Sequence, residues 1–202
     1  VPQERRLILL HLPLYHIYGN LMMNLSIYSC ITQILVPRFQ IDELVELMMR
    51  YEQITSFPTV PTVVSALLNH PRLDEINPGR RFISINASGG PTALSLIEQL
   101  DDMGIYTRQG WGMSETVSMG TNTPVFGIKK INSIGIPYPD NDVRLVDLEK
   151  GVEDVPRGEP GEIIIKSPTV MKGYWNNPEE TAQQLKDGWL YTGDIAIQDE
   201  DD

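Results

Sequence analysis

The sequence has a single cysteine, Cys30, among its 202 residues. One cysteine cannot close a disulfide within the chain, so a disulfide framework is excluded and a reducing, cytoplasmic setting is favoured. Because Cys30 lies in an apolar stretch, a buried thiol is the expected state.

Long hydrophobic runs are also missing. The longest apolar stretch, residues 27–36, is interrupted by polar residues and is shorter than the roughly 20 residues that span a bilayer. No transmembrane segment is therefore expected, and the first six residues carry no secretory signal. Peripheral attachment of the full-length protein to a membrane stays open.

Basic residues are few, since 16 Lys and Arg against 27 Asp and Glu give a net charge of −11. A nucleic-acid backbone needs a basic stripe, so nucleic acid is not an expected partner. An anionic small molecule would instead need a local cradle. Hydrophobic residues make up 41% of the chain, as in ordinary globular proteins.

Up to about Thr107, short apolar runs alternate with helical periodicity, which is typical of strand and helix units around a mainly parallel sheet. Strands are predicted at residues 7–12, 33–36 and 82–87. Helices are predicted at residues 41–51, from Pro61 onward and around residues 94–100. We therefore expect an α/β subdomain over residues 1–120.

After Gly120 the pattern changes to short runs rich in Val and Ile, such as 143–146 and 162–165, between Pro, Gly and Asp clusters. These runs predict a small β-rich, barrel-like subdomain over residues 121–202. The sequence stops directly after the apolar run 195–197, where a returning strand is expected to follow. It is therefore interpreted as an internal piece of a longer protein.

The most informative stretch is Gln109-Gly110-Trp111-Gly112-Met113-Ser114-Glu115-Thr116. Its glycines let the backbone approach a flat ring, and the hydroxyl and carboxylate that follow can reach a phosphate and its Mg²⁺. By itself, such a stretch is more often a glycine-rich turn beside a core tryptophan.

Three further segments occur with it in a fixed order. They are Leu12-Pro13-Leu14-Tyr15-His16, then Ser88-Gly89-Gly90-Pro91, and then a run from Gly158 through Gly173-Tyr174 to Tyr191-Thr192-Gly193-Asp194. Together the segments resemble the core signatures of the adenylate-forming superfamily, which contains acyl-CoA synthetases, aryl-CoA ligases, luciferases and peptide-synthetase adenylation domains. The resemblance implies part of the large N-terminal domain of such an enzyme, without its phosphate loop and C-terminal domain.

The resemblance also implies a nucleotide site. The turn matching Ser88, Gly89, Gly90 and Pro91 borders the adenine in that family. Trp111 replaces the usual tyrosine beside the adenine and keeps a flat face. Asp194 matches the aspartate that accepts hydrogen bonds from the ribose hydroxyls. The remaining nucleotide-binding positions implied are Gln109, Gly110, Gly112, Met113 and Ser114.

Three residues are expected to carry the chemistry. Glu115 matches the glutamate that binds Mg²⁺, and Ser114, in place of the commoner threonine, is expected to reach the phosphates. His16 is expected near the acyl carboxylate, although a lone histidine at a strand end is more often structural. His11 and His70 match no motif and are assigned no function.

The implied activity is that of an AMP-forming acid–thiol ligase. The resemblance favours a long- or medium-chain fatty acyl-CoA synthetase, because the segment around His16 resembles such enzymes and residues 57–62 resemble their acyl pocket. The expected small-molecule partners are a fatty acid, ATP with Mg²⁺, and coenzyme A as co-substrate. An aryl-CoA ligase and a non-catalytic nucleotide-binding module remain alternatives, and a homodimer stays open. The 202-residue chain by itself is expected to be inactive.

Overall fold

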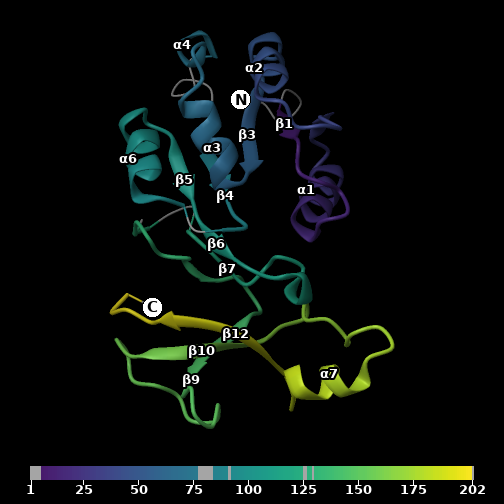
Figure 1. Ribbon diagram of the computed structural model, residues 1–202, viewed down its shortest axis with the longest axis vertical. Coiled ribbons are helices and arrows are strands. Elements are labelled where there is room, and N and C mark those ends of the chain that lie inside the picture. The colour runs from purple at the N-terminus through teal and green to yellow at the C-terminus, as the bar shows by residue number, and fades with distance from the viewer. Residues whose placement is uncertain (1–5, 77–83, 91, 125–126, 129, 202) are drawn as a thin grey trace.

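The computed structural model describes residues 6–76, 84–90, 92–124, 127–128 and 130–201. These residues form three sheets that follow one another along the long axis of the molecule (Figure 1). A parallel sheet with helices forms one end, an antiparallel sheet forms the other, and a small sheet lies between them. The expected combination of an α/β part and a β-rich part is confirmed.

Within the described part of the chain, the parallel sheet has five strands. In spatial order they are β2 (Thr32–Leu35), β1 (Leu7–Leu10), β3 (Ile54–Thr59), β4 (Ser84–Ala87) and β5 (Tyr106–Arg108). The strands predicted at 7–12 and 33–36 are present with slightly different ends. For the strand predicted at 82–87, residues 82 and 83 lie outside the described residues.

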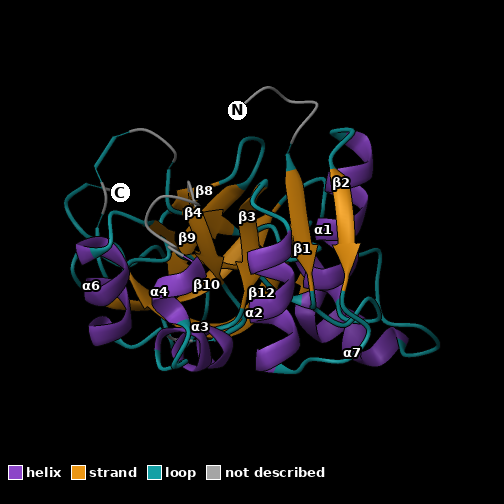
Figure 2. Ribbon diagram, turned by 90° about the horizontal axis from the view of Figure 1, so that it is seen from above, coloured by secondary structure: helices purple, strands orange, loops and turns teal. Residues whose placement is uncertain are grey.

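Helices lie on both faces of this sheet. They are α1 (Ile17–Tyr28), α2 (Ile41–Arg50), α3 (Pro61–Leu68), α4 (Leu73–Ile76) and α6 (Leu94–Asp102). Across the sheet, the crossover from β1 to β2 runs in one direction and the later crossovers run in the opposite direction. Because such connections are right-handed, α1 lies on one face of the sheet and the other helices lie on the second face. Figure 2 shows this arrangement.

The two faces of the sheet have separate apolar cores. Leu9 packs in the cluster that includes Val45 of α2 and Val64 of α3, whereas Leu10 packs with Tyr18 of α1. Successive residues of a strand point to opposite faces, so one short apolar run supplies both cores. Helix α2 confirms the amphipathic pattern, because its Leu44 is fully buried with Val45.

Residues 57–62, which resemble the loop and helix that line the acyl pocket of fatty acyl-CoA synthetases, begin within strand β3. Residues 57–59 belong to the central strand, and only from Pro61 does the chain turn helical. Pro58 is tolerated in this strand because the pairing of β3 with β1 extends only as far as Ser56, while the pairing with β4 continues to Thr59. Phe57 is fully buried in the core.

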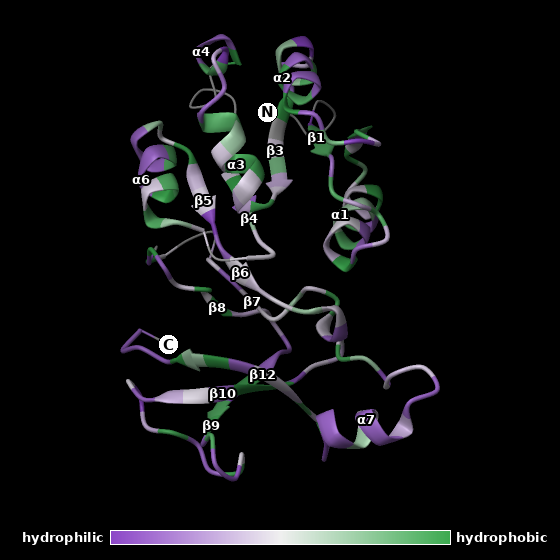
Figure 3. Cartoon of the chain, in the orientation of Figure 1, coloured by the Kyte–Doolittle hydropathy of each residue, from purple (hydrophilic) through white to green (hydrophobic). Residues whose placement is uncertain are grey.

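The antiparallel sheet is built from β9 (Asp142–Val146), β10 (Pro160–Lys166), β12 (Trp189–Ile197) and β11 (Leu185–Lys186). Helix α7 (Pro178–Gln184) precedes β11 and has no buried residue. Its hydrophilic colour in Figure 3 contrasts with the apolar stretches of α3. The intermediate sheet contains β6 (Gly110–Trp111), β7 (Thr121–Asn122) and β8 (Ile136–Pro137).

Cys30 corrects one expectation, because its side chain is exposed and not buried. The residue follows the end of α1 and has a φ of 53°, in the left-handed region that ends a helix. Its N–H donates to the Ile27 carbonyl. The turn geometry therefore decides its exposure. Among the described helices, none is long and apolar enough to cross a membrane.

Candidate functional site

The glycine turn follows β4 at the carboxyl edge of the parallel sheet, where ligands of open α/β sheets usually bind. The Ser88 N–H donates to the Thr59 carbonyl at 3.1 Å, which fixes the start of the turn against β3. Gly89 has a φ of +89°, a conformation that favours glycine. A Cβ on Gly90 would meet no atom of the described residues within 4 Å. Pro91 lies outside the described residues.

His16 has a structural role as the N-cap of a helix. Its Nδ1 accepts a hydrogen bond from the Tyr18 N–H at 3.2 Å, so the imidazole caps the N-terminus of α1. The buried Tyr18 hydroxyl in turn donates to the Asn86 carbonyl at 3.0 Å, and burial raises the pKa of this phenol. These contacts bring the start of α1, with His16, to the end of β4 beside Ser88.

The Trp111 ring packs closely against Gly120. A Cβ on Gly120 would lie 2.2 Å from Cε3 of Trp111, so only glycine permits this close packing of the indole. A Cβ on Gly110 would lie 2.5 Å from Nδ2 of Asn122, and one on Gly112 would meet the backbone of Ser118. The three glycines of the motif region therefore serve close approach within the protein.

The residues on either side of Trp111 are held by hydrogen bonds. The Gln109 N–H donates to Thr123 Oγ1 at 3.0 Å, and the Thr123 N–H donates to the Gln109 carbonyl at 2.7 Å. The Met113 N–H donates to Thr116 Oγ1 at 3.0 Å. A single 3₁₀ turn, η2 (Ser114–Thr116), follows, with Ser114 exposed at its start.

Glu115 is held by hydrogen bonds from a segment that lies far along the chain. The Tyr174 hydroxyl donates to Oε1 of Glu115 at 2.8 Å, and the Met171 N–H donates to the Glu115 carbonyl at 2.8 Å. Desolvation and the hydrogen bond to Glu115 raise the pKa of Tyr174 to about 12, so the phenol stays protonated near neutral pH. No lysine, arginine or histidine forms an ion pair with Glu115 among the described residues.

Asp194 stands on a bulge in β12. Glu162 of β10 is opposite Ile195 and Ile164 is opposite Tyr191, so three residues of β12 lie across from a single residue of β10. Gly193 within the bulge has a φ of +75°, and its N–H donates to Oε1 of Glu162 at 2.9 Å. A bulge of this kind re-aims a side chain, which here is the exposed carboxylate of Asp194.

The bulge brings Asp194 to Trp111. The indole Nε1–H of Trp111 donates to Oδ2 of Asp194 at 2.7 Å. The contact joins the intermediate sheet, which contains β6, to the antiparallel sheet, which contains β12. Two residues that were expected to bind the same nucleotide are therefore hydrogen-bonded to each other.

Arg108 is a neighbouring cation that the sequence reasoning missed. In the β4–β5 register it is opposite Asn86, two residues before the glycine turn. Its Nη2 reaches the Thr123 carbonyl at 3.5 Å, and its buried Nε has no hydrogen-bond partner among the described residues. In a chain of net charge −11, this guanidinium places positive charge near the edge where Ser88 lies.

The donor set suits a magnesium ion that arrives with a nucleotide. Mg²⁺ commonly takes one or two protein carboxylates and completes its coordination with phosphate oxygens and water. Tyr174 takes Oε1 of Glu115, and the described residues offer Oε2 no hydrogen bond. The described part of the chain contains no group of three or more His, Cys, Asp or Glu residues that could hold a metal. Glu115 therefore fits MgATP better than an ion bound by the protein alone.

The chain is similar in sequence to known proteins. The model of the AMP-binding enzyme family matches residues 2–175. The long-chain-fatty-acid–CoA ligase of Bacillus subtilis is 37% identical over 194 residues, which is 94% of this chain and 34% of that protein. The 2-succinylbenzoate–CoA ligase of Geobacillus kaustophilus is 36% identical over 98% of this chain and 39% of its own length.

Solved structures give the same result. ATP-bound MatB from Rhodopseudomonas palustris superposes with a TM-score of 0.87 at 30% identity, over 97% of this chain and 38% of that one. The o-succinylbenzoate coenzyme A synthetase of Bacillus subtilis in complex with AMP gives a TM-score of 0.83 at 30% identity, over 98% of this chain and 40% of that one. The chain thus spans well under half the length of the relatives it matches.

Proposed function

Because this chain belongs to the AMP-binding enzyme family, we propose that the product of the complete reading frame, here called the complete protein, is an ATP-dependent fatty acyl-CoA synthetase. The observation that carries the proposal is the contact between Trp111 and Asp194. It puts a flat aromatic face and a carboxylate acceptor side by side, which is what recognition of an adenine and its ribose requires.

The adenosine part of ATP would bind between the glycine turn and the Trp111–Asp194 pair. Trp111 would stack near the adenine, with the backbone of Gln109, Gly110, Gly112 and Met113 alongside. Asp194 uses Oδ2 for the indole N–H, which leaves Oδ1 and the remaining lone pair of Oδ2 for the ribose hydroxyls. The exposed backbone at Gly89 and Gly90 would border the base.

The reaction would proceed in two displacements. The substrate carboxylate attacks the α-phosphorus of ATP, the bond to pyrophosphate breaks, and an acyl-adenylate forms. The sulfur of coenzyme A then attacks the acyl carbon, and AMP leaves. Positioning and charge neutralisation dominate both steps. Glu115 would hold Mg²⁺, which when bound neutralises phosphate charge. The Ser114 hydroxyl would donate to a phosphate oxygen, and His16 would lie near the acyl carboxylate.

The choice of a fatty acid is supported by the long-chain-fatty-acid–CoA ligases among the relatives. An aryl-CoA ligase is the second candidate, since relatives of similar sequence identity are named 2-succinylbenzoate–CoA ligases. The two candidates share the adenylation chemistry and differ in the acid. The proposed setting is cytoplasmic.

The complete protein should be incubated with MgATP, coenzyme A and a panel containing fatty acids of several lengths and 2-succinylbenzoate. Mass spectrometry of the acyl-CoA products would identify the acid. A fatty acyl-CoA is the expected product. A 2-succinylbenzoyl-CoA product would favour the aryl candidate, and the absence of any acyl-CoA would contradict both.

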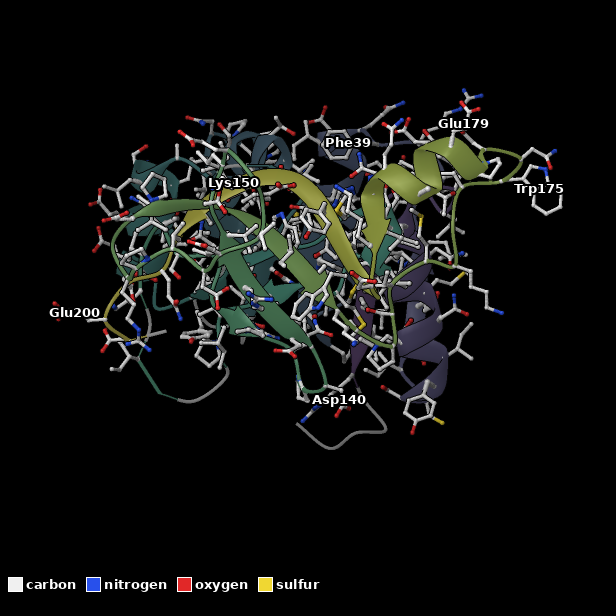
Figure 4. The ribbon with its side chains drawn as sticks, turned by 90° about the horizontal axis from the view of Figure 1, so that it is seen from below. Phe39, Asp140, Lys150, Trp175, Glu179 and Glu200 are labelled. Atoms are coloured by element: carbon white, nitrogen blue, oxygen red, sulfur yellow. The ribbon has the colours of Figure 1, made fainter. Side chains whose placement is uncertain are left out.

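Glu115→Gln tests the site within the same assay. The variant keeps the side-chain volume and removes the charge, so the rate of pyrophosphate release should fall by about 10²-fold. Glu179→Gln is a matched control, because Glu179 is an exposed carboxylate that projects outward from α7 (Figure 4). Pyrophosphate release at the wild-type rate by Glu115→Gln would show that this carboxylate has no role in the site.

A further inference from the structure

Tyr174 contacts the carboxylate proposed to bind magnesium, although no motif role was assigned to it. Its hydroxyl donates to Oε1 of Glu115 across 2.8 Å, over a separation of 59 positions in the chain. From this contact we infer that Tyr174 is a positioning residue, which holds the Glu115 carboxylate by Oε1 and leaves Oε2 to take the metal of MgATP. The inference rests on the proposed function, in which Glu115 binds Mg²⁺.

A second hydrogen bond from the same segment fixes the backbone of Glu115. The Met171 N–H donates to the Glu115 carbonyl at 2.8 Å. One residue of η2 is therefore held at its main chain by Met171 and at its side-chain tip by Tyr174. A glutamate side chain has three rotatable bonds, so two fixed ends remove most of its freedom before a metal arrives.

The position of Tyr174 is itself determined by α7. The Tyr174 N–H donates to Thr181 Oγ1 at 2.9 Å. Gly173 has a φ of +146°, and a Cβ at this position would lie 2.8 Å from Cγ2 of Thr181, so the turn depends on glycine. Asn177 caps the helix by accepting from the Glu180 N–H at 3.2 Å. The next aromatic residue, Trp175, is 92% exposed and projects outward (Figure 4).

The chemistry of the phenol suits positioning. A lysine or arginine at this place would neutralise Glu115 and compete with the metal for it. The neutral hydroxyl of Tyr174 orients one oxygen by a hydrogen bond and leaves the charge of the carboxylate available. Partners that orient metal-binding carboxylates in this way commonly change metal affinity by 10- to 100-fold when they are removed.

The test uses Tyr174→Phe in the complete protein, which removes one hydroxyl and keeps the ring. Binding of Mn²⁺ in the presence of α,β-methylene-ATP, followed by electron paramagnetic resonance, should weaken by about ten-fold. The concentration of free Mg²⁺ that gives half-maximal pyrophosphate release should rise by a similar factor, while the rate at saturating Mg²⁺ stays near the wild-type value. Tyr106→Phe is the matched control, because it removes a tyrosine hydroxyl that donates to the Pro124 carbonyl.

A double-mutant cycle with Glu115→Ala separates the inference from the proposed function. Tyr174→Phe should have no further effect on Mn²⁺ binding once Glu115 is alanine. If Glu115→Ala weakens Mn²⁺ binding and Tyr174→Phe does not, the inference alone is wrong. If Glu115→Ala binds Mn²⁺ like wild type, the proposed metal role is wrong as well. A Tyr174→Phe variant with a lowered melting temperature and unchanged Mn²⁺ affinity would give the hydroxyl a purely structural role.

Discussion

The indole N–H of Trp111 donates to a carboxylate oxygen of Asp194 across 2.7 Å, although 83 positions separate the two residues in the chain. Phenylalanine could not make this contact, because its ring has no donor. The hydrogen bond ties the aromatic face to the carboxylate before any nucleotide is bound. We therefore expect Trp111 to influence ribose recognition as well as adenine stacking.

Trp111→Phe should weaken ATP binding by about five-fold, because it keeps a flat ring and loses the hydrogen bond that orients Asp194 before the nucleotide binds. Isothermal titration calorimetry of the complete protein would measure the change. Trp189→Phe is the control, since the ring of Trp189 packs under the Arg144 guanidinium. If Trp111→Phe weakens ATP binding by the same factor in an Asp194→Ala background as in wild type, the indole acts by stacking alone.

Asp194→Ala should weaken ATP binding by roughly ten- to a hundred-fold, because hydrogen bonds to a charged acceptor contribute about 1.5–3 kcal/mol. Stability should change little, since the side chain is exposed. Comparing ATP with 2′-deoxy-ATP and 3′-deoxy-ATP tests the cause. Removing the ribose hydroxyls should lower the affinity of wild type and change the affinity of the variant very little. Equal losses of affinity in both proteins would mean that Asp194 has a role in the bulge but not in ribose binding.

His16 can be tested by separating its capping role from any chemical role. His16→Ala removes both the cap and the imidazole and should lower the free energy of unfolding by about 1 kcal/mol. His16→Asn keeps a capping acceptor and should restore stability. If His16 also acts near the acyl carboxylate, adenylation should stay impaired in the asparagine variant while ATP binding is nearly intact. Full recovery of adenylation in the asparagine variant would show that His16 acts only as a helix cap.

His11 should make stability depend on pH. Desolvation lowers the pKa of this buried imidazole from 6.5 to about 4, and its Nε2 is hydrogen-bonded to Thr59 Oγ1. The unfolded chain therefore takes up a proton below about pH 6.5 that the folded protein refuses until about pH 4. Stability should be complete above this window and fall within it by at most about 1.4 kcal/mol per pH unit.

Urea unfolding of wild type and His11→Gln at pH 7.5, 5.5 and 4.5 would check this prediction. The glutamine does not titrate, so the loss of stability between pH 7.5 and 4.5 should be smaller in the variant. Parallel pH profiles for the two proteins would show that other groups cause the dependence.

Much of the fold could be predicted from the sequence, because helices and strands have local periods. The apolar spacing of residues 41–51 predicted α2, and the short runs after Gly120 predicted the antiparallel strands. Strand β3 was missed, because Pro58 usually argues against a central strand. Its position beyond the ladder with β1 depends on the register of the sheet.

The sequence by itself determined the type of the strongly periodic elements and the motif residues, since glycines, a flat aromatic and acidic side chains at fixed spacing are readable without a structure. Only the tertiary structure decided which of these residues meet. The hydrogen bonds from Trp111 to Asp194 and from Tyr174 to Glu115 span 83 and 59 positions. Such contacts depend on how the sheets pack and on the bulge at Gly193, and no local period of the chain encodes them.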